Sequence, residues 1–464
     1  ALNTKDENDS PEEHFTDTIK AACGLADPNA VWGMTQAAPE LVHWLLKLGV
    51  KFNMSGYDDV DLRNFGGQKK KRTAFAQSDT GKQIMTAMID AVRRKEASGM
   101  VERFSHHSFL TLRLCGNICC GCVIRDEYSQ ETVELPGDAV IVATGGMHGL
   151  FGNTTGSLSN TGEVTAELFR LGVPLANGEM IQYHPTTVKC GGKRMLISEA
   201  ARGEGGRLFA MKDGKQWYFM EEKYPELGNL MPRDITAREI WKVSHESEVF
   251  LDMTEISEEI ISNKLSGLAD DCMTYLHKDI RKEPVSVLPG IHYFMGGILV
   301  DEQHRTPIQN LYAAGECCAQ YHGANRLGGN SLLGALYGGR VAAKSACEQA
   351  DVVDLSCATQ IDFPPASQIS EIKQLNKVMQ ETMGVVRNEN TLLNGIQTVQ
   401  ALTGNLPLLG MAVLKSALAR KESRGAHWRE DYPKSNDDDY LKTTVARFDG
   451  KQIQISFVPV PERR

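Results

Sequence analysis

Arg326 lies in a glycine- and asparagine-rich stretch, His322–Arg340 (HGANRLGGNSLLGALYGGR), directly before an apolar run of helical spacing. A helix that begins where these glycines end, with Asn330 or Ser331 as a natural N-cap, would point its free N–H groups and the positive end of its dipole toward the loop. Such an end suits a negative ligand, and a planar guanidinium can bind a carboxylate through two parallel hydrogen bonds. The pattern therefore indicates an anion site, although an arginine that ties down a loop would give the same pattern.

Four other segments place a polar donor or a cation beside proline or glycine. A histidine that precedes proline sits in extended backbone, which leaves its ring free to point into a cleft. A single histidine is more often a structural residue than a ligand, so no segment decides the matter alone. Their weight comes from their occurrence together with the Arg326 loop: Tyr183–Thr187 (YHPTT), Ser198–Gly206 (SEAARGEGG), Met231–Asp234 (MPRD) and Ile291–Gly297 (IHYFMGG).

Two apolar segments end in small residues and are typical of the strands of a doubly wound sheet. Asp138–Gly146 (DAVIVATGG) runs into paired glycines, where a nucleotide can approach bare backbone. The segment Gly296–Glu316 contains GGILVD and NLYAAGE and ends in a carboxylate. An acid at the carboxyl end of a strand is positioned to accept hydrogen bonds from a ribose, and the same residue could instead be a helix cap or a turn residue.

The composition is that of a large globular protein with more than one domain. The chain has 464 residues, of which 41% are hydrophobic and 23% charged. Because single cores stop growing at roughly 250 to 300 residues, we expect roughly two to three domains. The formal net charge of −9 argues against a nucleic-acid partner, since nucleic-acid binding draws on clustered Lys and Arg. No apolar stretch approaches the roughly 20 residues of a membrane helix, so any membrane role would come through partner subunits.

The spacing of apolar residues divides the chain into helical and mixed regions. Residues 185–290 carry more charge and several prolines, which is typical of an inserted domain. Near the C-terminus, alternating residues predict a hairpin that turns at Asp449–Gly450. Helices are predicted where apolar residues recur at three and four positions, the last of them stopping at Gly425: Pro39–Val50, Gly81–Lys95 and about Ser367 to Arg424.

The eleven cysteines are scattered, without the regular framework of a small secreted domain, which favours a reducing compartment. Cys115, Cys119 and Cys122 have the C-x3-C-x2-C spacing with which radical enzymes hold an iron–sulfur cluster. The residues on both sides alternate as strands do, so we expect these cysteines in a hairpin. We therefore predict buried or half-buried thiols there, and no metal site.

Together, the five ordered motifs closely resemble the flavoprotein subunit of succinate dehydrogenases and fumarate reductases, a family that includes L-aspartate oxidase. The resemblance covers nearly the whole chain. It implies an α/β fold in which a doubly wound FAD-binding domain is interrupted by a capping domain and followed by a C-terminal helical domain. The implied ranges are 1–184 and 291–362 for the FAD-binding domain, 185–290 for the capping domain, 363–432 for the helical domain and 433–464 for a hairpin tail.

The resemblance also implies a reaction, because members of this family interconvert fumarate and succinate by hydride transfer at flavin N5. It implies that Arg233 delivers or removes a proton, fed by a relay of Glu199 and Arg202. The pKa of arginine, above about 12, makes its deprotonated form scarce, so immediate reprotonation through that relay is required. A Glu and an Arg three residues apart are otherwise a helical surface pair. The residues implied to hold the substrate carboxylates are His184, Ser198, His292 and Arg326.

The flavin contacts carry over in the same way. The implied FAD-binding residues are Ala143, Thr144, Gly145, Glu163, Glu316, Asn330, Ser331 and Leu332. Ser331 and Leu332 would bring the helix N-terminus to the pyrimidine edge of the flavin, where its dipole would raise the flavin potential. Glu163 stands where the family often has Asp.

No G-x-G-x-x-G motif occurs in the chain, which matches the family from just after its first strand, its dinucleotide loop and its flavin-attaching histidine. We expect this first Rossmann strand and glycine-rich loop to precede Ala1 in the intact protein, because a domain without its first strand would expose a long apolar edge. The covalent attachment of FAD is left open by this part of the chain.

Phe65 bears on the choice of substrate. In aspartate oxidases, a Glu that can pair with the substrate ammonium precedes the paired glycines of the early loop; here RNFGGQ places Phe65 there. An apolar ring offers nothing to an amino group, so the resemblance favours fumarate and succinate, with L-aspartate oxidase as the alternative. A second alternative is a flavin-free binding or assembly subunit.

The tail hairpin resembles that of the subunit type that docks on an iron–sulfur protein. The resemblance therefore implies an iron–sulfur subunit and a membrane anchor as partners. It also implies a cytoplasmic chain, peripheral on the inner face of the membrane through those subunits.

Overall fold

The computed structural model describes residues 1–57, 59–65, 68, 70–77, 79–157, 159–349, 363 and 368–464. Its nucleotide-type core is a parallel pair, β8 (Val140–Val142) beside β18 (Leu311–Ala313), and helix α10 (Asn330–Gln349) packs against both strands. Each strand runs directly into its predicted turn, ATGG after β8 and AAGE after β18. Because the whole capping segment lies between these paired strands in sequence, the prediction of an interrupted α/β domain is confirmed.

A second sheet joins the tail to the rest of the molecule. The predicted tail hairpin is confirmed as β20 (Lys442–Phe448) and β21 (Ile453–Pro459), with Asp449 and Gly450 in the turn. Strand β20 also pairs with β9 (Leu175–Ala176), so the hairpin closes a five-stranded sheet. The sheet order is β19-β17-β9-β20-β21, with β17 at Gly297–Leu299 and β19 at Cys318–Ala319.

The capping segment contains two antiparallel sheets and several short helices. One sheet has the order β11-β10-β16, and the predicted boundaries at 184 and 290 fall inside the paired strands β10 and β16. A separate buried core lies between the second sheet and its helices. The bounds are β10 Ile181–Cys190, β11 Lys193–Leu196, α5 Glu199–Gly203, β12 Arg207–Lys212, β13 Lys215–Trp217, α6 Phe219–Lys223, α7 Arg233–Val243, β14 Val249–Asp252, α8 Glu258–Lys264, α9 Ser266–Asp271, β15 Val285–Ser286 and β16 Leu288–Phe294.

Helices α1 (Pro11–Ala21), α2 (Pro28–Leu48) and α3 (Thr80–Ala97) form the N-terminal layer, and α2 packs against both α3 and α10. The two helices predicted here are confirmed, with α2 starting earlier than predicted. It starts early because Asp27 caps it, accepting from the N–H groups of Asn29 and Ala30, and because Pro28 is preorganised for the first helical position. Short strands occupy the polar stretch before α3: β1 Met54–Gly56, β2 Asp59–Val60, β3 Leu62–Arg63 and β4 Thr73–Ala74.

The C-terminal helical region contains α11 (Ile369–Thr382), α12 (Glu389–Val399), α13 (Asn405–Ala419) and the short α14 (Asp437–Tyr440). The prediction that the last long helix runs to a stop at Gly425 is wrong, because α13 ends at Ala419. Arg420 turns out of the helix into extended backbone. Its buried guanidinium donates to Glu179 at 2.7 Å and to Glu422 at 2.8 Å, and these bonds outweigh helical continuation.

The predicted cysteine hairpin is confirmed as β5 (His107–Cys115) and β6 (Ile118–Asp126), joined to β7 (Thr132–Pro136). Cys119 is buried and Cys122 half-buried, as predicted, and burial raises the pKa of the Cys119 thiol to about 11. The prediction of a thiol at Cys115 is wrong, because Cys115 is disulfide-bonded. In the part of the chain that the structure describes, no three His, Cys, Asp or Glu side chains are grouped to hold a metal ion.

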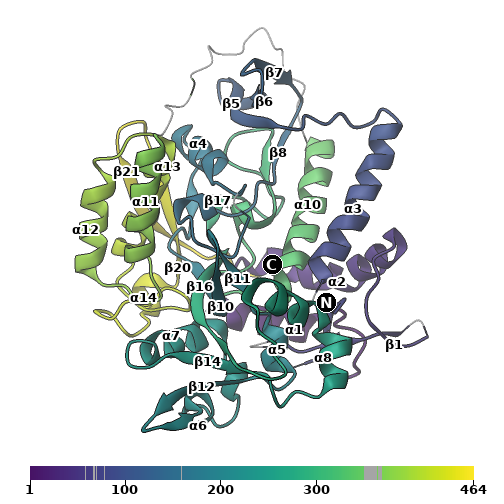
Figure 1. The fold of residues 1–464 in the computed structure, drawn as a ribbon. Coiled ribbons are helices and arrows are strands. Elements are labelled where there is room, and N and C mark those ends of the chain that lie inside the picture. The colour runs from purple at the N-terminus through teal and green to yellow at the C-terminus, as the bar shows by residue number, and fades with distance from the viewer. Residues whose placement is uncertain are drawn as a thin grey trace.

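Figure 1 shows how these parts surround the central strands. The helices α11, α12 and α13 form one flank and α3 and α10 the other, while the capping elements β12, β14 and α7 lie at the end opposite the hairpin β5–β6. Among the described residues, the structure contains no helix of the length and apolarity that crossing a membrane requires.

Candidate active site

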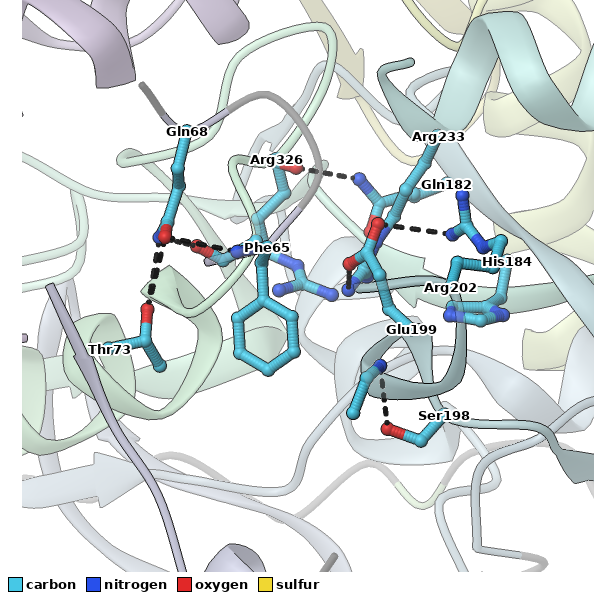
Figure 2. A network of polar contacts seen from close by, with 12 residues as sticks. Phe65, Gln68, Thr73, Gln182, His184, Ser198, Glu199, Arg202, Arg233 and Arg326 are labelled. Atoms are coloured by element: carbon cyan, nitrogen blue, oxygen red, sulfur yellow. Dashed lines mark hydrogen bonds and ion pairs between the residues drawn. The ribbon is translucent and has the colours of Figure 1, made fainter. Parts of the chain in front are cut away.

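The polar residues of the predicted site meet at one cavity of about 290 Å³ between the capping segment and the N-terminus of α10. Its opposite wall is apolar, with Leu41 and Leu45 from α2, Ile84 from α3 and Leu336 from α10. Figure 2 shows Arg326, Phe65 and the Glu199–Arg233 group gathered around one space. The predicted residues that line the cavity are Phe65, His184, Ser198, Glu199, Arg233, His292, Arg326, Ser331 and Leu332.

Glu199 lies between two guanidinium groups. Arg233 donates to Oε2 from Nε at 3.1 Å and from Nη2 at 2.7 Å, and Arg202 donates to Oε1 from Nη2 at 3.1 Å. Arg202 is also held by the backbone carbonyl of Asn229 at 2.6 Å. All three charged side chains are buried, so the group is a buried bridge and not the exposed helical pair considered as its alternative.

Two helix N-termini position this bridge. Ser198 caps α5, its Oγ accepting from the N–H of Ala200 at 3.3 Å, which places Glu199 at the first helical position. Arg233 is the first residue of α7, directly after Pro232, whose ring stops the helix from extending backwards. Both charged side chains thus start from fixed helix ends at the cavity wall.

The charge state of Glu199 follows from these contacts. Burial alone would raise the pKa of Glu199, but the charges of Arg233 and Arg202 outweigh it and lower that pKa to about 2. Burial also lowers the pKa of Arg202. Glu199 is therefore an ionised carboxylate at neutral pH, and it bridges the two arginines as an acceptor.

Arg326 differs from the other two arginines because it has no carboxylate partner among the described residues. Its side chain is buried, the residue being 4% exposed, and its Nε has no hydrogen-bond acceptor. The guanidinium carbon lies 4.4 Å from the centre of the Tyr293 ring. Burial, and then the charge of Arg233, lowers the pKa of Arg326 to about 9, so it is still a cation at neutral pH. A buried cation without a counter-charge is costly, and an anionic ligand would supply that charge.

His184 and His292 stand edge to face, with ring centres 5.2 Å apart and planes at 70°. The Nδ1 atom of His184 lies 3.2 Å from the carbonyl oxygen and 3.3 Å from the backbone nitrogen of Thr186, and that of His292 lies 2.8 Å from Oγ1 of Thr155. Burial, followed by nearby positive groups, lowers the pKa of each histidine well below its usual range. When Nδ1 of the neutral His184 ring accepts from Thr186, Nε2 carries the proton and can donate it in a hydrogen bond to a carboxylate.

Phe65 reaches the cavity because its loop is fastened to the Arg326 loop. The N–H of Phe65 donates to Oε1 of Gln68 at 3.2 Å, and Nε2 of Gln68 donates to the carbonyl of Gly328 at 2.7 Å. A Cβ on Gly328 would lie only 2.5 Å from the Cβ of Phe65. Glycine in NRLGG is thus required for the approach of these two loops.

Sequence reasoning missed Arg63, which also lines the cavity. Arg63 lies 3.6 Å from the centre of the Phe75 ring and donates to the carbonyl of Gln77. Burial lowers its pKa to about 10, and the charges of Glu204 and Asp61 act in the opposite direction. Its position two residues before Phe65 was the available signal, because alternate residues of an extended segment share a face.

Gln182 was missed as well. It is fully buried on β10, where it accepts from Arg233 at 3.0 Å and donates to the backbone carbonyl of Arg326 at 2.9 Å. It lies two residues before His184, so the period of the strand again gave a usable signal. Gln182 therefore contacts the guanidinium of Arg233 in the capping segment and the backbone of Arg326.

The predicted nucleotide residues gather around the end of β8. Glu316 accepts from the N–H of Phe294 at 3.0 Å and lies 3.5 Å from Nε2 of His148. A Cβ on Gly146 would lie 2.7 Å from the Glu316 carboxylate, so glycine permits the turn to approach it. Ala143 and Thr144 are exposed at this turn, and Gly145 has a positive φ of 73°.

The remaining predicted flavin residues divide into two groups. Ser331 and Leu332 line the cavity at the N-terminus of α10. Asn330 is buried and its side chain contacts α1, with Oδ1 2.9 Å from Nε2 of His14 and Nδ2 donating to Thr18 at 3.0 Å. Glu163 is exposed at the start of α4 (Glu163–Arg170).

These features fit FAD. The glycine turn beside Glu316 leaves bare backbone for a nucleotide, and the helix end at Ser331 and Leu332 offers N–H donors to a group that carries negative charge. Between the N-terminus of α10 and the side of the cavity that carries Arg326, the apolar side chains of α2 and α3 leave a space suited to a flat ring system.

Comparison with known proteins gives the family. The chain matches the FAD binding domain model over residues 1–332 and the fumarate reductase flavoprotein C-terminal model over residues 402–463. It is 36% identical to the succinate dehydrogenase flavoprotein subunit of Bacillus subtilis (strain 168), over 100% of this chain and 90% of the relative. It is 31% identical to the L-aspartate oxidase of Nostoc sp. (strain PCC 7120 / SAG 25.82 / UTEX 2576), over 95% of this chain and 84% of the relative.

A solved structure of a fumarate reductase chain has the same fold. A mutant E. coli quinol fumarate reductase FrdA chain superposes with a TM-score of 0.89 at 26% identity, covering 99% of this chain and 88% of that one. The chain therefore belongs to the succinate dehydrogenase and fumarate reductase flavoprotein family and is an FAD-dependent oxidoreductase of that type.

Proposed function

We propose that this chain interconverts fumarate and succinate, as the catalytic subunit of an electron-transfer complex. The observation that carries the proposal is the cavity itself, where the unpaired cation Arg326 and the two neutral histidines face the Arg233–Glu199 bridge across about 290 Å³. Fixed donors on both sides of one cavity suit a small molecule with a carboxylate at each end.

The chain's own residues would bind and orient that diacid. Arg326 can take one carboxylate through paired N–H groups, and His184, His292 and Ser198 can donate to the carboxylates. Reduction of fumarate leaves carbanion character on the carbon beside a carboxylate, so cations held at that carboxylate stabilise the charge as it develops. Their effect grows as the capping segment excludes water.

Arg233 would deliver the proton to that carbon. A guanidinium has five N–H groups, and three of those of Arg233 are engaged by Glu199 and Gln182. One N–H on each terminal nitrogen is left without a partner in the described part of the chain, and Arg233 lines the cavity. The carboxylate of Glu199 touches both guanidiniums, so a proton given up by Arg233 can be replaced from Arg202 through it.

FAD, when bound, supplies or accepts the hydride at its N5. Glu316 and the ATGG turn would hold its nucleotide part, and the N-terminus of α10 at Ser331 would face its pyrimidine edge. The predicted roles of Ala143, Thr144, Gly145, Glu163, Asn330 and Leu332 in FAD binding are part of the same proposal.

The walls of the cavity favour a diacid over an amino acid. Among the described residues that line the cavity, Glu199 is the only carboxylate, and two arginines already engage it. Phe65 offers an apolar ring where an ammonium would need an acceptor. L-aspartate oxidase, the activity of two relatives, is therefore the second candidate.

The relatives' names motivate the proposed partners. One relative, 31% identical, is the 8-methylmenaquinol:fumarate reductase flavoprotein subunit of Wolinella succinogenes. By analogy, we assign to this chain an iron–sulfur subunit and a membrane anchor, with a location on the cytoplasmic face of the membrane.

The test uses the full-length protein with its natural N-terminus, loaded with FAD. Fumarate should oxidise a chemically reduced dye, and the Arg233→Gln variant should lose that turnover while dicarboxylates still perturb the flavin spectrum. Turnover with L-aspartate and none with succinate would select the alternative. A purified protein with no flavin spectrum, and none after FAD is added, would instead select a binding or assembly subunit.

A further inference from the structure

A line of hydrogen bonds joins Arg233 to Asp234, its neighbour in sequence, through two amide side chains, Gln182 of β10 and Asn325 of the Arg326 loop. Nη1 of Arg233 donates to Oε1 of Gln182 at 3.0 Å. Nε2 of Gln182 donates to Oδ1 of Asn325 at 2.9 Å, and Nδ2 of Asn325 donates to Oδ1 of Asp234 at 3.0 Å. The line leaves the start of α7, crosses β10 and the Arg326 loop, and returns to α7.

Its two ends fix the direction of every bond in the line. Arg233 can only donate, so the oxygen of Gln182 must face it, and the amide nitrogen must then face Asn325. Gln182 Nε2 also donates to the backbone carbonyl of Arg326 at 2.9 Å, which fixes the same orientation independently. At the other end the Asp234 side chain accepts from Asn325, so neither amide can turn over without placing like groups against each other.

Burial makes these bonds costly to lose. Gln182 is 0% exposed and Asn325 is 5% exposed, so a partner removed from either is not replaced by bulk water. The bonds of Asn325 to Asp234 and to Gln182, and the bond of Gln182 to the Arg326 carbonyl, tie α7 and β10 of the capping segment to the loop that carries Arg326.

We propose that Gln182 and Asn325 form a latch that holds the capping segment closed over the cavity, with Arg233 in position for proton transfer. Both are positioning residues, acting through Arg233 and the Arg326 backbone. The proposal rests on the proposed function in one respect: the proton transfer is the one assigned to Arg233 above.

The latch explains why Arg233 points into the cavity. Glu199 holds Nε and Nη2 from one side, and Gln182 holds Nη1 from another, so the plane of the guanidinium is set by two supports. Without Gln182, the group could rotate about its remaining bonds to Glu199. A displacement of about 1 Å at a reacting group can cost on the order of 100-fold in rate.

The first experiment compares Gln182→Met, which keeps the length of the side chain but has no amide, with the FAD-loaded full-length parent. We expect kcat for fumarate reduction to fall by about 10- to 100-fold, with a change in KM of less than about 3-fold. The matched control is Gln216→Met on the exposed strand β13, which should match the parent in both constants. A Gln182→Met kcat within twofold of the parent would overturn the proposal.

The second experiment exchanges the polar ends of one bond. In Asn325→Asp, two carboxylates face each other, and we expect the same loss of kcat as in Gln182→Met. In the double variant Asn325→Asp with Asp234→Asn, the amide of position 234 can donate to the carboxylate of position 325, which still accepts from Gln182. At least about 5-fold recovery of kcat over Asn325→Asp is expected, and a double variant no better than the single one would contradict the latch.

A third measurement separates the latch from the proposed function. Hydrogen exchange of the first turn of α7 reports cap closure without any substrate. Exchange should be faster in Asn325→Asp than in the parent and should return toward the parent in the exchanged pair. If the parent has no dicarboxylate activity but shows this exchange pattern, the latch stands and the proposed reaction fails. Equal exchange in all three proteins would overturn the latch itself.

Discussion

Replacing Glu199 by glutamine tests the central feature of the site, a single carboxylate shared by two buried arginines. The substitution keeps the shape of the side chain and removes its charge. It also sets an amide NH₂ against a guanidinium, so one donor loses its acceptor. A buried pair that loses one partner typically costs about 3 to 5 kcal/mol, because the remaining charge is left uncompensated.

The pKa of Glu199 gives a magnitude for the charge term alone. A pKa lowered from 4.5 to about 2 in the folded protein contributes about 3 kcal/mol to the free energy of unfolding, at about 1.36 kcal/mol for each pH unit. Because the folded pKa lies below the unfolded one, this contribution is complete above about pH 4.5. It is lost as the pH falls toward 2, with about half of it left at pH 3.

The assay is urea unfolding of the parent and of Glu199→Gln in the same buffers from pH 7 to pH 3. The parent should be more stable by about 3 kcal/mol at pH 7, and the difference should narrow to about half by pH 3. The control is Glu221→Gln, which removes an ion pair with Arg207 whose side chains are 37% and 38% exposed and should cost no more than about 1 kcal/mol. A difference that stays constant from pH 7 to pH 3 would refute the assignment of this energy to the Glu199 charge.

Three further predictions follow from the same contacts. Arg326→Gln removes a buried cation that has no carboxylate partner among the described residues, so the affinity for dicarboxylates should fall by about 10- to 100-fold while FAD stays bound. The affinity is measured from the change in flavin absorbance. An unchanged affinity would mean that the dicarboxylate binds elsewhere. Phe65→Glu adds an acceptor to the cavity wall and should confer measurable binding of L-aspartate by the same absorbance change; no gain would remove Phe65 as a determinant of substrate choice. Arg420→Met leaves the buried carboxylates of Glu179 and Glu422 without their cation, so the free energy of unfolding in urea should fall by about 3 to 5 kcal/mol. The control is the exposed Arg463→Met, which should lower it by less than about 1 kcal/mol. Equal effects of the two substitutions would contradict a buried network.

The sequence predicted those features that depend on local pattern. The amphipathic periods of α2 and α3, the small-residue turns after β8 and β18, and the Asp449–Gly450 hairpin were all recognisable, because each depends on residues close together in the chain. The family motifs also led to the residues around the cavity, although their spacing alone said nothing of how they would face one another.

The features that were missed depend on distant partners. The end of α13 at Ala419 follows from the bonds of Arg420 to Glu179, far away in the sequence. The pairing of β20 with β9 likewise depends on a strand that precedes the capping segment. Gln182 and Arg63 stood beside recognised motifs, but their roles appear only once the loops that they contact are placed. Buried polar side chains have hydrogen-bond partners, and the local sequence pattern does not identify those partners when they are distant in the chain.

The charges of the site support the proposal of a diacid substrate over aspartate. Of the charged side chains that line the cavity, Arg63, Arg233 and Arg326 are positive and Glu199 is negative, which leaves two positive charges in excess. His184 and His292 add none at neutral pH, because burial and the neighbouring arginines keep the pKa of each well below its usual range. A fumarate or succinate dianion cancels that excess, whereas aspartate at neutral pH carries a net charge of about −1 and an ammonium that the arginines repel. Under the proposed function, the buried arginines would therefore favour a diacid by charge before any contact selects it by shape.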